Sequence, residues 1–271
     1  MKIKQAFGLT VILYLIEVTL YAIFPYLFGN YDGFFEHYGD FPYDNLQGVS
    51  YLISRIIAYF IIFSIIKEKN INWKKEFNYK NYKIFIIFLL VLVVMGLQLV
   101  NHAVFQIDKI IGYFFLNNDT IYNFHFEGFN LEFVYRSIAV IALSPILEEL
   151  FFRKILFQKL KEKYSLKTSL IISSICFALI HIDDPNNLIP TFFFGLISGL
   201  IYHKTNKIGY SILLHLFYNL YWFGMVTVGE QYINWLFNLE FNYIYWLLFL
   251  LGMILTFIGM KKITSANNVY N

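Results

Sequence analysis

The chain has 271 residues, of which 58% are hydrophobic and only 14% are charged, and its mean hydropathy is +0.56. Soluble domains carry about 25% charged residues, so this composition excludes an ordinary soluble domain and indicates a polytopic membrane protein. The single cysteine, Cys176, excludes a disulfide within the chain. We therefore expect the lipid bilayer as the surroundings of the protein, and no nucleic-acid partner.

Apolar segments, taken in chain order, predict the membrane spans, since about 20 helical residues cross a hydrocarbon core of about 30 Å. The first segment follows Met1-Lys2-Ile3-Lys4. Its length of about 20 residues exceeds a secretory signal core of about 7–15 residues, so we interpret it as a retained span. We expect eight spans, at 6–28, 47–66, 83–104, 136–160, 168–182, 188–203, 208–228 and 243–260.

The placement of lysine predicts the orientation of these spans. Lysines cluster before the first span, in alternate loops and after the last span: Lys2, Lys4, Lys67, Lys69, Lys74, Lys75, Lys80, Lys83, Lys159, Lys161, Lys163, Lys167, Lys204, Lys207, Lys261 and Lys262. The other loops, 29–46, 183–187 and 229–242, contain acidic residues and no lysine. Because lysine-rich loops face the cytoplasm, we predict a multi-pass cell-membrane protein with both termini cytoplasmic.

No internal repeat or linker divides the chain, so residues 1–271 are expected to form a single transmembrane domain. The expected fold class is all-α, with about eight helices around a polar intramembrane cavity. Gly195 and Gly199 form a small-xxx-small pair, which predicts close helix packing. The region 105–135 is less regular, and we expect an interfacial helix from Ile107 to Leu116 followed by an exposed turn at 117–119.

Polar residues inside the apolar segments are the candidate functional residues. Glu148 and Glu149 lie in one span, His181 in the next, and His215 and Asn219 in a third. A charge near the bilayer centre costs about 2.5–3.5 kcal/mol, so such residues need a function or a partner. At about 1.5 Å per helical residue, Glu148, the two histidines and Asn219 lie about 12–20 Å from the lysine that flanks each span. They therefore converge near the middle of the bilayer.

Residue spacing assigns partners to these groups. Glu149 and Arg153 are four residues apart on one helix and can form an ion pair. Glu148 is rotated by about 100° from Glu149 and is expected in a largely apolar cavity, where a carboxyl group suits general acid or base catalysis. His181 could hold a water molecule with Glu148.

The third motif suits the stabilisation of negative charge. His215 and Asn219 are four residues apart, so a ring N–H and an amide N–H could both point at one developing oxyanion. Residue chemistry also leaves a zinc site open, with Glu148, His181 and His215 as ligands and a free fourth position.

Other polar or irregular positions have more than one interpretation. Glu17 in the first span could be a structural hydrogen-bonding residue or a contact of the polar cavity. Arg55 in the second span could pair with Glu17 or face the cavity. Pro145 is expected to break or kink its helix and to open space beside Glu148. Cys176 is interpreted as a small packing residue.

The three motifs together resemble those of a known family. Glu148-Glu149-x-x-x-Arg153, Phe177-x-x-x-His181 and His215-x-x-x-Asn219 occur in this order on successive spans. They resemble the motifs of the CPBP family of CAAX proteases and bacteriocin-processing proteins, also called Abi. The resemblance covers about 144–220.

This resemblance implies an intramembrane endopeptidase, a hydrolase similar to the CAAX prenyl protease, built as eight helices around a water-filled cavity. Glu148 and His181 would match the residues that activate water, and His215 with Asn219 the pair that stabilises the oxyanion. Glu149 and Arg153 would be supporting residues. The mechanism proposed for the prenyl-protease branch uses no metal, so we expect no cofactor, with zinc as the alternative.

The substrate and a second functional class remain open at this stage. The composition, rich in Ile, Lys, Asn, Phe and Tyr, suggests an AT-rich bacterial genome and a plasma-membrane location. We expect a peptide or membrane-protein substrate, as in the maturation of bacteriocins or signalling peptides or in self-immunity. The alternative is a transporter or immunity protein that uses the same polar cavity without cleavage. The sequence contains no signal for an oligomeric state.

Overall fold

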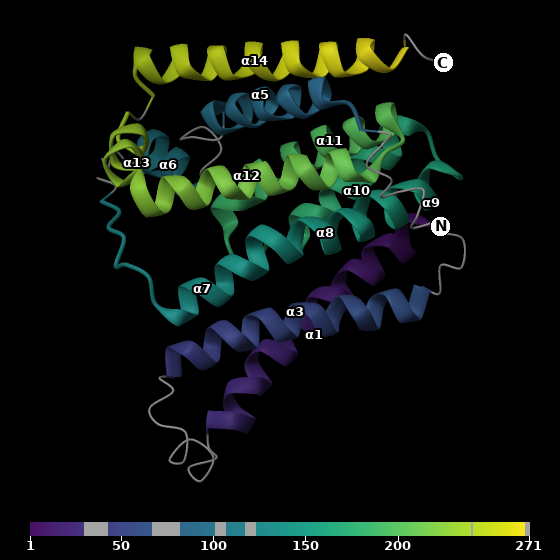
Figure 1. Ribbon diagram of the computed structural model, residues 1–271, viewed down its shortest axis with the longest axis vertical. Helices are drawn as coiled ribbons and strands as arrows, with labels where there is room; N and C mark the ends of the chain where they lie inside the picture. Colours follow the sequence, from purple (N-terminus) through teal and green to yellow (C-terminus); the bar gives the residue numbers. More distant parts are fainter. Residues whose placement is uncertain (30–42, 67–81, 101–106, 117–122, 240, 269–271) are drawn as a thin grey trace.

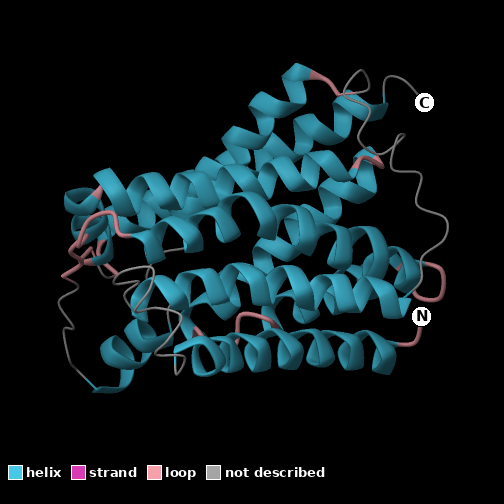
Figure 2. Cartoon of the chain, turned by 60° about the horizontal axis from the view of Figure 1, so that its bottom comes forward, coloured by secondary structure: helices cyan, strands magenta, loops and turns pink. Residues whose placement is uncertain are grey.

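The computed structural model describes residues 1–29, 43–66, 82–100, 107–116, 123–239 and 241–268. Within these ranges the regular elements are all helices, joined by short loops, and no strand occurs (Figure 2). The predicted all-α fold is confirmed.

Every predicted apolar segment coincides with a helix in the described residues. Seven of them are single helices: α1 (Ile3–Gly29), α3 (Tyr43–Ile66), α5 (Ile84–Val100), α10 (Leu166–Leu179), α11 (Leu188–Thr205), α12 (Ile208–Val228) and α14 (Tyr243–Asn268). By length and composition, α1, α3, α12 and α14 can cross a membrane, and α5 and α10 are shorter apolar helices. The chain is therefore a helical membrane protein, and the number of passes stays a prediction.

The segment that carries both glutamates is a composite helix. It consists of α7 (Leu131–Ile138), the π-helical η4 (Ala139–Leu143), α8 (Ser144–Glu149), the π-helical η5 (Leu150–Phe157) and α9 (Gln158–Lys161). The Asn130 side chain caps its start by accepting a hydrogen bond from Phe133 N at 2.7 Å. Pro145 does not end the helix. The irregularities are the π-helical η4 before it and the π-helical η5 after Glu149, and π-helical turns are common near functional sites.

The helices form a bundle whose two termini lie at the same end (Figure 1). Helices α1 and α3 cross each other on one side and α3 packs on α7, while α5 and α14 pair on the opposite side. Two contacts hold the shared end together: the amino group of Met1 donates to Lys159 O at 2.9 Å, and Lys83 Nζ donates to Ala266 O at 3.0 Å. We call this the terminal end, and the end with α13 (Glu230–Phe237) the loop end.

At the loop end, an extended segment is tied to α13 by side-chain contacts. Asn234 accepts a hydrogen bond from Phe124 N at 2.6 Å and donates to Phe124 O at 2.8 Å. Glu230 accepts from Phe126 N at 3.2 Å and lies 3.1 Å from Nδ1 of His125. The hydrogen bond from His125, followed by that from Phe126, lowers the pKa of Glu230.

Shorter elements complete this end, namely α6 (Ile107–Ile111), the π-helical η3 (Gly112–Leu116) and the 3-10 turn η6 (Pro185–Asn187). The helix predicted over 107–116 is thus present. The predicted turn at 117–119 and most of the acidic loop 29–46 lie outside the described residues.

Close packing at Gly195 and Gly199 is confirmed. A Cβ atom at Gly195 would lie 3.0 Å from Ser174 Cβ, and one at Gly199 would lie 2.8 Å from Leu170 Cδ2. Both contacts are with α10, so the small residues let α11 approach it closely. This packing fixes α10, which precedes His181, against the helix that carries Ser198.

Candidate active site

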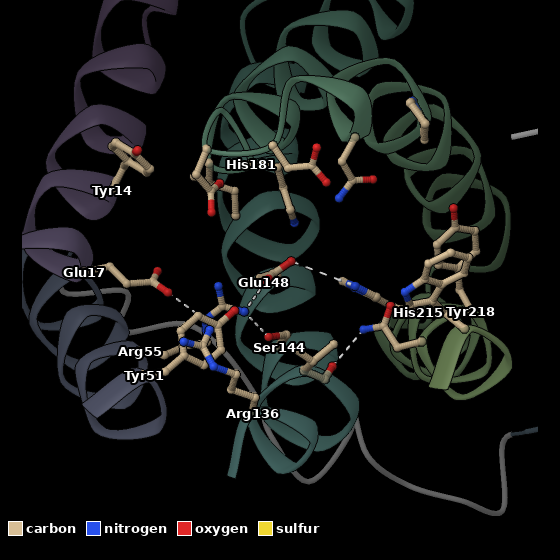
Figure 3. A pocket seen from close by; sticks show the side chains of 18 of the residues that line it. Tyr14, Glu17, Tyr51, Arg55, Arg136, Ser144, Glu148, His181, His215 and Tyr218 are labelled. Carbon is tan, nitrogen blue, oxygen red and sulfur yellow. Dashed lines mark hydrogen bonds and ion pairs between the residues drawn. The ribbon is translucent and has the colours of Figure 1, made fainter. Parts of the chain in front are cut away.

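A polar cavity of 740 Å³ lies inside the bundle (Figure 3). Most of its wall comes from α1, α3, the composite helix, the turn after α10, and α12, with single residues from α5, α11 and α13. Glu148, His181, His215 and Asn219, drawn from three separate segments, all line it. The structure therefore brings together the four residues that the sequence singled out as catalytic candidates.

Glu148 is 1% exposed, and its two carboxylate oxygens differ in surroundings. Oε1 accepts a hydrogen bond from Arg55 Nη1 at 3.1 Å. Oε2 lies 3.9 Å from His215 Nε2, beyond hydrogen-bond distance, and has no hydrogen-bond partner among the described residues. One oxygen is thus held in place by Arg55, while the other is buried and has no hydrogen-bond partner in the described residues.

Arg55 occupies a central position on the cavity wall. Its Nε donates to Glu17 Oε1 at 2.7 Å, its Nη1 donates to Ser144 Oγ as well as to Glu148, and its guanidinium lies 5.0 Å from the Tyr51 ring centroid. Arg55 therefore pairs with Glu17 and faces the cavity at once, so both interpretations of this residue hold. The expectation that Glu148 has largely apolar surroundings is wrong in one respect, because α3 places the Arg55 guanidinium against its carboxylate.

Glu149 points away from the cavity and is completely buried. Its Oε2 lies 3.2 Å from Arg153 Nε and accepts a hydrogen bond from Ser198 Oγ at 2.5 Å, while Oε1 lies 3.3 Å from His215 Nδ1. The ion pair predicted from the four-residue spacing is confirmed. Arg153, also completely buried, stacks 4.6 Å from the Phe177 ring centroid.

His181 lies in the turn that follows α10, just beyond the helix end at Leu179. Its Nδ1 is 3.0 Å from the carbonyl oxygen of Phe177. A carbonyl oxygen can only accept, so Nδ1 carries the proton, and a neutral ring then has its free lone pair on Nε2. No hydrogen bond joins His181 directly to Glu148 in the described residues, so a bridging water stays a prediction.

His215 stands between the two glutamates, with Nδ1 toward Glu149 and Nε2 toward Glu148. Its ring also packs 4.9 Å from Phe194 and 5.8 Å from Phe177, measured between centroids. These contacts fix the plane of the ring, so that its Nε2 edge is presented to the cavity.

Asn219 makes a contact that the motif alone does not indicate. Its Nδ2 donates to the backbone oxygen of Val140 at 2.7 Å. In η4, Ser144 N donates five residues back to Ala139 O, so the next such bond, to Val140 O, would need the N–H that Pro145 lacks. Asn219 supplies that missing donor from α12. Its amide nitrogen keeps a second hydrogen for the cavity.

The side chains of the cavity include groups that can bind a metal ion. Among the described residues, no group of three His, Cys, Asp or Glu side chains is gathered as a metal site. The three residues considered as zinc ligands, Glu148, His181 and His215, share the cavity wall. Zinc held by these three residues therefore stays the alternative to a metal-free site.

The structure adds site residues that sequence reasoning missed. Ser144 precedes Glu148 by four residues, and that spacing was a usable signal for a shared helix face. Ser198, by contrast, comes from α11 and reaches Glu149 only through helix packing, so no local pattern identified it. Arg136, which also lines the cavity, is held by Glu132 at 2.7 Å and by the Tyr21 hydroxyl at 2.9 Å.

Comparison with known proteins supports the motif assignment. Residues 130–221 match the family model described as Type II CAAX prenyl endopeptidase Rce1-like, and this stretch contains all four candidate catalytic residues. A protein of Bacillus subtilis (strain 168) named "Putative membrane peptidase YdiL" is 37% identical over 79 residues, which cover 29% of this chain and 32% of that protein. The match thus spans about a third of that relative. No solved structure gives a significant match. The resemblance to the CPBP family is therefore confirmed, and the matched residues 130–221 include the composite helix, the turn after α10 and the part of α12 that carries His215 and Asn219.

Proposed function

We propose that this protein is an intramembrane endopeptidase that uses Glu148 to activate water. The observation that carries this proposal is the asymmetry of the Glu148 carboxylate. Arg55 anchors Oε1, whereas Oε2 is buried, without a hydrogen-bond partner in the described residues, and lies at a polar cavity. A carboxylate placed in this way can take a proton from a water molecule without losing its position.

The proposed reaction begins when water, held between Glu148 Oε2 and His181 Nε2, attacks the carbonyl carbon of a peptide bond. Its proton passes to Glu148 as the new C–O bond forms. The resulting oxyanion would lie against His215 Nε2 and the free amide hydrogen of Asn219. Collapse of this intermediate breaks the C–N bond, and the proton moves to the departing amine. The products are a free carboxylate and a free amine.

The residues behind the cavity have a supporting role in this proposal. Glu149 holds His215 through Nδ1, and Arg153 with Ser198 holds Glu149. The other ring nitrogen, Nε2, lies on the side of Glu148 and is the one that would face the oxyanion.

The finer assignments belong to the same proposal. We infer a bacterial plasma-membrane protein with eight spans and both termini in the cytoplasm. Its substrates are peptides or membrane proteins, as in the maturation of bacteriocins or signalling peptides or in self-immunity. No cofactor is required in this mechanism, and zinc held by Glu148, His181 and His215 is the competing form.

The test is a comparison of cells that produce the wild-type protein, Glu148→Gln or Glu162→Gln. Newly formed peptide termini in the membrane fraction are identified by mass spectrometry. Glu162 is an exposed acid that follows the same composite helix, so its variant is the matched control. We expect cleavage sites that depend on Glu148 and not on Glu162.

Two outcomes would contradict the proposal. Identical termini in all three cell types would favour the transporter or immunity function. Loss of cleavage by the purified protein on treatment with a chelator, and its return with Zn²⁺, would replace the metal-free mechanism with the zinc form.

A further inference from the structure

The cavity occupies only one half of the bundle. On the composite helix its lining residues are Arg136, Val140, Ser144 and Glu148, at four-residue intervals, and none lies beyond Glu148 in η5 or α9. All of them lie on the part of this helix that runs from the loop end to the glutamate. Glu148 therefore marks the floor of the cavity along this helix.

The neighbouring helices show the same limit. On α12, which starts at the terminal end, the lining begins at His215 and continues through Tyr218 to Trp222. On α1, which starts near the amino terminus at Ile3, the lining begins at Tyr14 and continues to Tyr21. Each helix thus contributes only its part nearer the loop end, although their chain directions differ.

The cavity reaches the surface at the loop end. Asp183 and Asp184, in the turn between α10 and α11, are exposed and line it together with Asn186 and Asn187. The side chain of Asp184 caps η6 by accepting a hydrogen bond from Asn186 N at 3.2 Å. The rim is therefore a polar turn with a fixed shape.

The half of the bundle below Glu148 is filled with side chains. Phe151, Phe152, Leu156 and Phe157 on η5 are all 0% exposed. Arg153 is also 0% exposed and lies among them, where it pairs with Glu149 and packs on the Phe177 ring. In the described residues these close-packed side chains fill the space below Glu148, and the part of the cavity lining that is exposed lies at the loop end.

The distribution of lysine tells the two ends apart. The described lysines other than Lys109 in α6 belong to the half of the bundle at the terminal end. There Lys159 contacts the amino terminus, Lys161 contacts His203, and Lys83 contacts Ala266. The loop end has Glu127, Asp183, Asp184 and Glu230 on its described surface segments. By the positive-inside rule, the packed terminal end is cytoplasmic and the open loop end is extracytoplasmic.

We infer that the active site opens to the extracytoplasmic side of the membrane, and that its substrates are peptide segments presented there. These are exported peptides or the extracytoplasmic flanks of membrane-spanning segments, and not cytoplasmic carboxy-terminal tails. The inference of substrate class rests on the proposed peptidase function. The sidedness of the cavity rests on geometry and lysine placement alone, so the two can be tested separately.

The sidedness test uses single cysteines introduced into a Cys176→Ala protein and a charged methanethiosulfonate reagent that does not cross membranes. Tyr51→Cys and Tyr218→Cys report on the cavity wall from two helices, so failure of one variant to fold does not end the test. Asp184→Cys reports on the rim, and Lys163→Cys is the matched control at the exposed terminal end. Labelling is measured in intact cells and in inside-out vesicles.

In intact cells we expect labelling of the cavity and rim cysteines and not of Lys163→Cys, and in inside-out vesicles the reverse. Labelling of the cavity cysteines from the vesicle side only, or from both sides, would overturn the inference. Cavity cysteines that react from neither side while Asp184→Cys reacts would also overturn it, because the cavity would then be closed to water.

The substrate arm uses the cleavage sites that depend on Glu148. We expect these sites to map to exported peptides or to extracytoplasmic flanks, whereas sites in cytoplasmic tails would contradict the substrate class. If no such site exists but the labelling pattern is as expected, the peptidase function fails and the sidedness of the cavity stands. The two failures therefore give different results.

Discussion

Glu148 and Glu149 are neighbours in sequence, yet they belong to different regions of the molecule. Glu148 forms the floor of the polar cavity, and its Oε2 has no hydrogen-bond partner in the described residues and lies 3.9 Å from His215 Nε2. Glu149 lies in the packed half, where Arg153, Ser198 and His215 surround it. A rotation of about 100° along one helix separates the two environments. The comparison teaches that contact with the cavity, and not burial or hydrogen bonding, distinguishes the two carboxylates, because each of them has one oxygen without a hydrogen-bond partner in the described residues.

The largest expected effect is a difference in thermal stability between Glu149→Gln and Glu148→Gln. Glu149→Gln leaves the completely buried Arg153 without its counter-charge, and breaking a buried pair costs about 3–5 kcal/mol. Glu148→Gln removes only one of the two carboxylates that pair with Arg55, which keeps Glu17, and should leave thermal stability near the wild-type value. Thermal unfolding of both variants in the same detergent measures this difference. A greater loss in Glu148→Gln than in Glu149→Gln would reverse the assignment of the two regions.

The next effect concerns the pair on α12. Removal of one oxyanion donor typically costs about 10²–10³ in turnover, so we expect such a loss in His215→Ala and in Asn219→Ala. Because the two act together, the double variant should lose less than the product of the single losses. Substrate binding should persist in each, since the charge that they stabilise exists only in the transition state.

Thermal stability should distinguish Asn219→Ala from His215→Ala. Asn219→Ala also leaves the carbonyl of Val140 without a donor, at a cost of about 1–3 kcal/mol, so it should lower thermal stability as well as turnover. Asn219→Ala with unchanged stability would show that the carbonyl oxygen of Val140 accepts a hydrogen bond from another group.

The His215→Ala variant also tests for a metal. If it releases a stoichiometric metal from the purified protein, His215 is a metal ligand and the metal-free mechanism is wrong.

Substitution of Arg55 tests whether activity depends on cavity residues outside residues 130–221, the segment that matches the family model. Hydrogen bonds to charged groups contribute about 1.5–3 kcal/mol, so Arg55→Gln should lower kcat by about 10- to 150-fold. KM should change little, because Arg55 acts through the position of Glu148. Arg55→Lys keeps the charge without the planar fork and should recover part of kcat.

Arg136→Gln is the matched control for Arg55, because Arg136 lines the same cavity but is held by Glu132 and Tyr21. Its kcat should stay close to that of the wild type. Equal losses of kcat in Arg55→Gln and Arg136→Gln would mean that the cavity needs positive charge in general, and not the contact with Glu148. An increase in KM alone for Arg55→Gln would place Arg55 on the substrate.

The smallest expected effect lies at the surface of the loop end. The pKa of Glu230 is lowered by His125 and by Phe126 N, so its carboxylate contacts are present at neutral pH and are lost as the pH falls through that lowered pKa. Hydrogen exchange of segment 123–127 should be slower in the wild type than in Glu230→Gln at pH 7, and the difference should disappear in acid. Equal exchange in the two proteins at pH 7 would assign the protection to Asn234, whose hydrogen bonds to Phe124 both proteins keep.

Several features of this protein were predictable because they are local. The apolar lengths predicted helices at all eight positions, and the four-residue spacing of Glu149 and Arg153 predicted their ion pair, since 3.6 residues per turn place such residues on one face. Gly195 and Gly199 similarly predicted the close approach of α11 to its neighbour. The ordered motifs predicted which polar residues would share the cavity.

Only the tertiary structure decided which charges meet and where the cavity opens. Arg55 reaches Glu148 across 93 residues, and Asn219 reaches the carbonyl left by Pro145 across 79. No local pattern contains these contacts, because in a membrane both the lipid-facing and the core-facing sides of a helix are apolar. Phe60 on α3 is 71% exposed and Ile62 is 0% exposed, although both are hydrophobic. The rotation of each helix is therefore set by packing against its neighbours and not by the alternation of polar and apolar residues.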